Sequence, residues 1–106
     1  MKEHRVISSG EEIRSEDRLF NAVLQLKTIE ECRAFFRDLC TPAELQAMKD
    51  RWGVAELLAQ GLTYRDIRNK TGVSVTTVGR VARCLAEEPP GYSAVLKRLG
   101  KQDQIT

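Results

Sequence analysis

The feature that most constrains the fold of this chain is a pair of helix-start signals separated by a short turn. Thr63 and Ser74 each precede a segment with helical periodicity, and Thr71-Gly72-Val73 lies between the two segments. A threonine or serine at such a position accepts a hydrogen bond from a backbone N–H in the first turn of a helix, and a glycine commonly ends one. Residues 63–85 therefore predict two short helices joined by a turn, the outline of a helix-turn-helix.

The second of these helices has two chemically different sides. Because a helix turns by about 100° per residue, one side carries an apolar stripe formed by Val78, Val81, Ala82 and Leu85. We expect this stripe to pack on Ile67 and Val73. The opposite side carries Thr76, Gly79, Arg80 and Arg83. A helix with an apolar back and a front of hydroxyl, glycine and arginine groups is suited to the major groove of DNA.

Positive charge is concentrated in the same segment. Residues 63–85 hold five basic residues against Asp66 alone, a net charge of +4, whereas the whole chain has a net charge of +2. On the second helix, Arg80 and Arg83 are candidates for binding guanine edges or phosphates, with solvated surface charges as the alternative. The first helix usually crosses the DNA backbone. Its candidates for phosphate contacts are Arg65, Arg68 and Lys70.

Smaller side chains near the start of the second helix complete the predicted DNA-binding surface. Ser74, Thr76 and Thr77 can donate hydrogen bonds to phosphates or bases, and Ser74 is also a helix cap. Val75 can contact a thymine methyl group. Gly79 inside a helix costs about 1 kcal/mol relative to alanine. It therefore predicts a close approach to DNA or to a packed helix, with simple tolerance of the glycine as the alternative.

Helical periodicity and capping signals also organise the rest of the chain. The remaining helices are predicted at about residues 15–27, 28–39, 41–60 and 92–99, with Thr28 and Thr41 as the caps of the second and third of these. The helix over residues 28–39 is expected to bury Ile29, Cys32, Phe35, Phe36 and Leu39. No segment alternates for long enough to propose a strand, so the predicted fold class is all-α, with about six helices. Residues 1–13 are expected to form a flexible polar arm, residues 14–100 a single helical domain for DNA binding and dimerisation, and residues 101–106 a polar tail.

Composition limits the classes of function. No apolar run is long enough to cross a membrane, and the first residues lack the apolar stretch of a secretion signal. We therefore expect a cytoplasmic protein without a membrane partner. The three cysteines have no C-x-x-C spacing, and His4 has no companions at ligand spacing, so no metal site is predicted. No catalytic cluster is recognisable either, which predicts that the protein is not an enzyme.

Residues 39–85 resemble the Trp repressor superfamily, in particular its Trp-repressor-like branch. The motifs that carry the resemblance are Thr41-Pro42-x-Glu44, Arg51-Trp52, Leu57-Leu58, Gly61-Leu62-Thr63-Tyr64-Arg65, Gly72-Val73-Ser74 and Arg80. The resemblance implies a regulator whose first helices interlock with those of a second chain in an intertwined all-helical dimer. The many apolar residues in the first 40 positions agree with a homodimer, because a small core needs fewer. A compact monomer is the alternative.

The resemblance also implies a possible ligand pocket, because some members of the family bind a tryptophan corepressor. Arg51 and Arg80 match the two arginines that flank the indole ring in those members. Helical projection places Arg51 between two apolar arcs, where it needs an anion, an internal salt bridge or an extended path to solvent. Val81, on the inward stripe, stands where the tryptophan-binding repressor has a glycine that leaves space for the indole. We therefore predict that no cofactor is required and that L-tryptophan is not a corepressor, although another small molecule remains open.

These patterns predict a sequence-specific transcriptional regulator, a repressor, that binds double-stranded DNA as a homodimer. The alternative is a helix-turn-helix module that positions DNA, or mediates interactions, within a recombinase or another larger complex. No catalytic domain accompanies the motif, which argues against the recombinase version.

Overall fold

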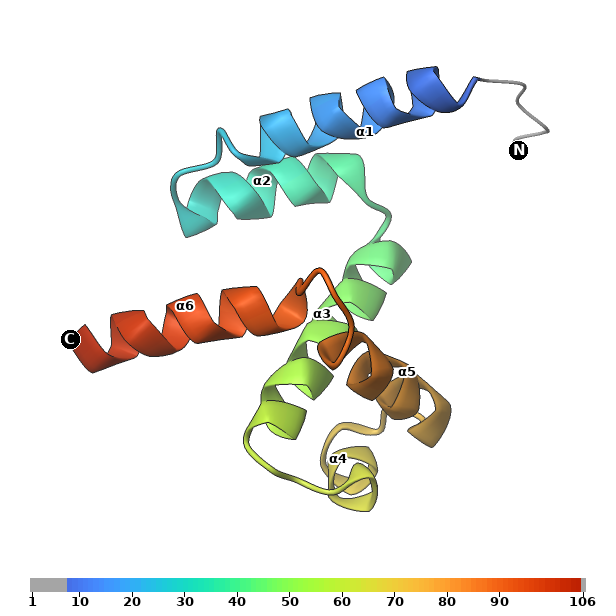
Figure 1. The fold of residues 1–106 in the computed structure, drawn as a ribbon, viewed down its shortest axis with the longest axis vertical. Coiled ribbons are helices and arrows are strands. Elements are labelled where there is room, and N and C mark those ends of the chain that lie inside the picture. Colours follow the sequence, from blue (N-terminus) through green and yellow to red (C-terminus); the bar gives the residue numbers. More distant parts are fainter. Residues whose placement is uncertain (1–7, 106) are drawn as a thin grey trace. The chain divides into compact units, whose positions relative to one another are not determined.

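The protein is described by a computed structural model that covers residues 8–105, with side chains for residues 8–100. This part of the chain contains six helices and no strand: α1 (Ser9–Val23), α2 (Ile29–Leu39), α3 (Pro42–Ala59), α4 (Tyr64–Thr71), α5 (Val75–Leu85) and α6 (Tyr92–Ile105) (Figure 1). The predicted all-α fold class is confirmed. The helices divide into two compact units, one ending at Cys40 and the other beginning at Thr41.

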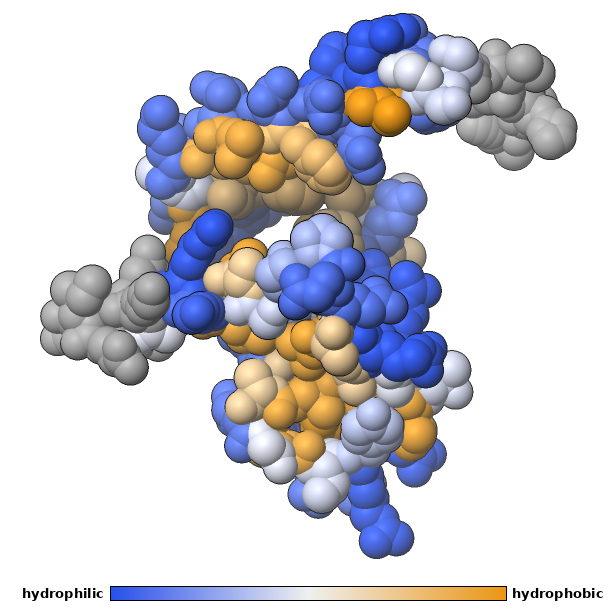
Figure 2. All heavy atoms as spheres, viewed as in Figure 1, coloured by the Kyte–Doolittle hydropathy of each residue, from blue (hydrophilic) through white to orange (hydrophobic). Residues whose placement is uncertain are grey.

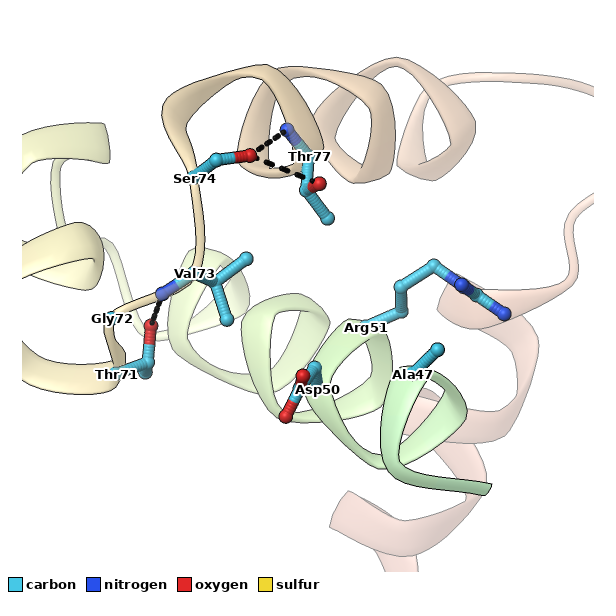
Figure 3. Close-up of a pocket in the computed structure, with 8 residues that line it drawn as sticks. All are labelled: Ala47, Asp50, Arg51, Thr71, Gly72, Val73, Ser74 and Thr77. Carbon is cyan, nitrogen blue, oxygen red and sulfur yellow. Dashed lines mark hydrogen bonds between the residues drawn. The ribbon is translucent and has the colours of Figure 1, made fainter. Parts of the chain in front are cut away.

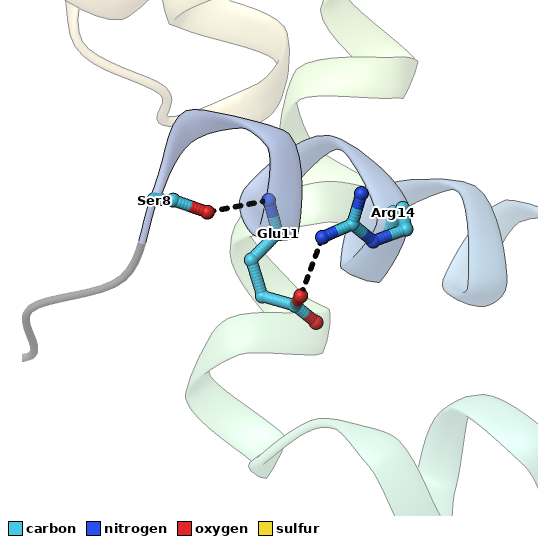
Figure 4. Close-up of polar contacts among 3 residues, drawn as sticks. All are labelled: Ser8, Glu11 and Arg14. Atoms are coloured by element: carbon cyan, nitrogen blue, oxygen red, sulfur yellow. Dashed lines mark hydrogen bonds and ion pairs between the residues drawn. The ribbon is translucent and has the colours of Figure 1, made fainter.

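The first helix starts within the predicted flexible arm. Ser8 caps α1 by accepting a hydrogen bond from the backbone N–H of Glu11 at 3.1 Å, and Arg14 pairs with Glu11 at 2.7 Å (Figure 4). These contacts are polar, whereas the prediction relied on an apolar stripe to locate the helix. The prediction was therefore wrong for residues 9–13, which are helical, while residues 1–7 lie outside the described residues.

The last helix continues beyond its predicted end. α6 extends to Ile105, whereas the sequence predicted that the helix ends near residue 99 and a polar tail follows. The final residues are mostly polar, but lysine and glutamine have good helix propensity and do not need an apolar face to stay helical. None of the helices in the described part of the chain has the length and apolarity that crossing a membrane requires.

A small apolar core holds α3, α4 and α5 together. Its fully buried members come from all three helices, and they are Val54, Ala55, Ile67, Val78 and Val81. Half-buried apolar residues surround them, among them Val73 and Leu85. Trp52 of α3 lies against Tyr92 at the start of α6, with ring centroids 6.2 Å apart. The predicted packing of the α5 stripe on Ile67 and Val73 is thus confirmed.

The unit formed by α1 and α2 has no comparable core. None of the described residues in these two helices is buried, and apolar groups are visible at the surface of the unit in Figure 2. The prediction that α2 buries Ile29 and Leu39 is wrong for the single chain, because these side chains are 70% and 50% exposed. Cys32 is exposed as well. Periodicity identified the apolar side of each helix correctly, but this chain does not cover it.

Replacing Ile67 with alanine should lower the free energy of unfolding by about 2–5 kcal/mol, because the substitution opens a cavity in the core of α3, α4 and α5. Val75→Ala changes a side chain on the exposed side of α5 and should alter that free energy by less than about 0.5 kcal/mol. Urea unfolding at one fixed protein concentration, followed by the fluorescence of Trp52, measures both variants. Equal effects of the two substitutions would contradict the assignment of the core.

Candidate nucleic-acid interface

Local hydrogen bonds fix the turn between α4 and α5. Gly72 ends α4 in the left-handed region, at φ 78°, which favours glycine, and its N–H donates to the carbonyl of Arg68 at 2.8 Å. The hydroxyl of Thr71 donates to the carbonyl of Ile67 at 2.7 Å and accepts from the N–H of Val73 at 3.1 Å. Together with the core, these bonds hold the two helices in the arrangement that the helix-turn-helix prediction requires.

Both predicted caps of this motif are present. The hydroxyl of Thr63 accepts a hydrogen bond from the N–H of Asp66 at 3.1 Å and so starts α4. The hydroxyl of Ser74 accepts from the N–H of Thr77 at 3.2 Å and donates to the Thr77 hydroxyl at 3.1 Å (Figure 3). Because Ser74 uses its hydroxyl twice within the cap, it serves to start α5. Thr77 keeps its own hydroxyl proton for a further partner.

The two sides of α5 differ as the sequence predicted. Val78 and Val81 are 0% and 1% exposed, whereas Thr76, Arg80 and Arg83 on the other side are exposed. Val75, in the first turn, is 47% exposed. No salt bridge ties either arginine to an acidic side chain in the described part of the chain. The outer side of α5 therefore presents two guanidinium groups that are available to a ligand.

Gly79 is not required by close helix packing. A methyl group placed on its Cα would lie 3.9 Å from Cε2 of Tyr64 and 3.9 Å from a guanidinium nitrogen of Arg83, which are ordinary van der Waals distances. The expectation of a close approach to a packed helix is therefore wrong. A close approach to DNA and simple tolerance of the glycine remain as interpretations.

The basic residues of α4 belong to the same structural unit. Arg65, Arg68 and Lys70 are all exposed, and α4 packs directly on α5. Asp66 is the only acidic residue of α4, and it lies in the first turn. The positive end of the helix dipole stabilises a negative charge at that position. The two helices of the motif thus carry five exposed basic side chains against one acidic side chain.

A surface pocket of about 330 Å³ lies where α3 meets the turn between α4 and α5 (Figure 3). The residues that line it are Ala47, Asp50, Arg51, Thr71, Gly72, Val73, Ser74 and Thr77. Of the three residues predicted to form a ligand pocket, only Arg51 is among them. Arg80 is exposed, and Val81 belongs to the core. The structure therefore does not bring the three together in this pocket.

Arg51 is half-buried and forms no salt bridge among the described residues, so of the alternatives for its charge the internal salt bridge is absent there. Its side chain extends away from Asp50 in Figure 3, and Asp50 instead accepts a hydrogen bond from the side-chain amide of Gln46 at 2.9 Å. The sequence analysis missed Asp50. The available signal was its spacing, because residues 47, 50 and 51 fall on one side of a helix.

The family model of the Trp repressor protein matches residues 14–100. The chain belongs to the Trp repressor family. Members of this family are DNA-binding transcriptional regulators, which agrees with the basic surface of α4 and α5. The predicted resemblance is therefore confirmed, and it extends over most of the chain.

Individual proteins are similar to this chain over most of their length. The chain is 46% identical to the uncharacterized protein YerC of Bacillus subtilis over 83 residues, which cover 78% of this chain and 80% of YerC. It is 33% identical over 79 residues to a Trp operon repressor homolog of Chlamydia caviae, covering 74% and 78% of the two chains. The crystal structure of a TrpR-like protein from Eubacterium eligens matches with a TM-score of 0.78 and 41% identity, over 82% of this chain and 90% of that one.

Arg80→Ala and Arg65→Ala should impair DNA binding in different ways. Loss of Arg80 should relax sequence preference at one base position by about 1–3 kcal/mol, because α5 is the helix expected to face the bases. Loss of Arg65 should weaken binding to all sequences alike and lower the slope of log affinity against log salt by about one unit, because a phosphate contact is lost. Affinities for a panel of single-base variants, measured over a salt series, separate the two effects. The reverse pattern would exchange the roles of α4 and α5.

Proposed function

We propose that this protein is a transcriptional repressor that binds double-stranded DNA sequence-specifically in the cytoplasm, with α5 in the major groove. One observation carries the proposal: α5 has Val78 and Val81 locked in the core and exposed Arg80 and Arg83 on its outer side. Such a helix can enter a groove without exposing the core. No cofactor is required for this function, because the positive charge that attracts DNA comes from the side chains themselves.

Selection of binding sites from random duplex DNA tests this proposal. We expect a reproducible consensus sequence, and we expect a promoter that carries this sequence to be transcribed less when the protein is added. If the selection recovers no consensus sequence, sequence-specific binding is contradicted. An increase in transcription would contradict the repressor role while leaving DNA binding intact.

We further infer that the working form is a homodimer. Six large apolar side chains of the unit that contains α1 and α2 are exposed in the single chain: Ile13, Leu19, Phe20, Leu24, Ile29 and Leu39. Apolar surface of this kind normally marks an interface in a water-soluble protein. A second copy of the chain supplies a matching apolar surface, and two-fold symmetry is the commonest arrangement of identical subunits. A dimer also doubles the number of bases that are read, which a repressor needs for specificity.

The dimer should bind two half-sites about one helical turn of DNA apart, roughly 34 Å. Phe20→Glu places a charge on the apolar side of α1, so it should shift the protein to monomers and abolish tight binding to the paired sites. Asn21→Glu adds the same charge at the neighbouring exposed polar position and is the matched control. Sedimentation and footprinting give the two measurements. If a monomer bound one unpaired half-site with full affinity, the proposed homodimer would be contradicted.

We also propose that free L-tryptophan is not a corepressor of this protein. An indole ring between Arg51 and Arg80 needs space beside α5, and the buried side chain of Val81 is an obstacle there. Forcing additional bulk into a filled site costs about 1–3 kcal/mol, enough to remove one or two decades of a modest affinity. Another small ligand for these residues remains compatible with the proposal.

Calorimetric titration with L-tryptophan tests this expectation. The unmodified protein should give no binding heat, whereas Val81→Gly should bind, provided that circular dichroism shows the variant to be folded. Micromolar binding to the unmodified protein, together with tighter binding to DNA, would show that Val81 leaves room for the ring.

A further inference from the structure

Tyr64 lies beside the predicted DNA-binding surface, although the sequence analysis assigned it no role in binding. It is the first residue of α4 and is 44% exposed. Its Cε2 atom lies 3.9 Å from the position that a Cβ atom on Gly79 would occupy, so the ring reaches across from α4 to α5. Cε2 is bonded to the carbon that bears the hydroxyl group. The hydroxyl end of the ring is therefore the end that lies next to α5.

The fold does not use this hydroxyl group. No hydrogen bond of the Tyr64 side chain is formed within the described part of the chain, and the residue is not among those packed on the core of α3, α4 and α5. α4 begins through the cap at Thr63 and is anchored by Ile67. A phenol that is placed by its neighbours but lacks a partner is available to a ligand.

We propose that Tyr64 is a further DNA-binding residue, whose hydroxyl group donates a hydrogen bond to a backbone phosphate next to the bases read by α5. This inference rests on the proposed function. Tyrosine is one of the side chains that donate to phosphate oxygens, and the first helix of the motif is the one that crosses the backbone. A guanidinium nitrogen of Arg83 also lies 3.9 Å from the Gly79 Cβ position, so a phosphate bound by the Tyr64 hydroxyl would sit near a positive charge.

The proposal also gives Gly79 a function that needs no close packing. A methyl group at residue 79 would only touch the ring of Tyr64 and the guanidinium of Arg83. A longer side chain would start 3.9 Å from both groups and take up space beside them. The glycine thus keeps open the approach through which the tyrosine hydroxyl and the arginine can reach the same stretch of DNA backbone.

Tyr64→Phe removes the hydroxyl group and keeps the ring. We expect the affinity for all duplex sequences to fall by about tenfold, since a hydrogen bond to a charged phosphate is lost. The slope of log affinity against log salt should not change, because a neutral hydroxyl releases no counterions. Arg65→Ala, in contrast, should change that slope. Tyr92→Phe makes the same chemical change at the tyrosine that packs on Trp52, and it should leave DNA affinity unaltered.

Two results would overturn the inference while the proposed function stands. If Arg80→Ala relaxes sequence preference but Tyr64→Phe binds like the unmodified protein, Tyr64 is only a packing residue. If Tyr64→Phe changes the preferred sequence, the hydroxyl group contacts a base and not a phosphate. If the unmodified protein fails to bind any duplex DNA, the proposed function and this inference both fall. Urea unfolding of Tyr64→Phe, with an unchanged midpoint, excludes a loss of folding as the cause of weaker binding.

Discussion

The burial of Val78 and Val81 against Ile67 is the contact on which the DNA-binding surface depends. It fixes the rotation of α5 about its own axis, and this rotation decides which side chains face outward. A rotation by one residue, about 100°, would expose valines and turn arginine toward the core. Fully burying each valine contributes roughly 1.5–3 kcal/mol, which exceeds the cost of about 1 kcal/mol for a glycine inside the same helix. The apolar side therefore sets the orientation, and the outer side is free to carry residues chosen for binding.

Much of this fold could be predicted from the sequence because its signals are local. Thr28, Thr41, Thr63 and Ser74 each cap a helix as expected, and the apolar stripe of α5 is buried as expected. Burial in α1 and α2 could not be predicted in the same way. Periodicity shows which side of a helix is apolar, but it does not show whether the same chain covers that side. Phe20 and Ile29 follow the helical period as clearly as Val78 does, yet they are more than half exposed.

The candidate site shows the same division between local and non-local information. The outward position of Arg80 and Arg83 follows from projecting one helix, so the sequence was sufficient. The relation of Tyr64 to Gly79 depends on how α4 packs on α5, and a projection of either helix alone cannot show it. The ligand pocket was predicted in another way. Arg51, Arg80 and Val81 were grouped through family resemblance, and of these three only Arg51 lines the pocket between α3 and the turn before α5.

The distribution of buried residues also assigns different physical tasks to the two units of the chain. The unit that begins at Thr41 closes a core of its own from α3, α4 and α5, so its outer surface can be polar and basic. The unit that ends at Cys40 leaves its apolar sides exposed and gains most by burying them against another surface. A dimer held together through α1 and α2 would use residues other than those proposed to contact DNA. Substitutions in α4 and α5 could then alter which DNA is bound while the contacts that pair the subunits stay intact.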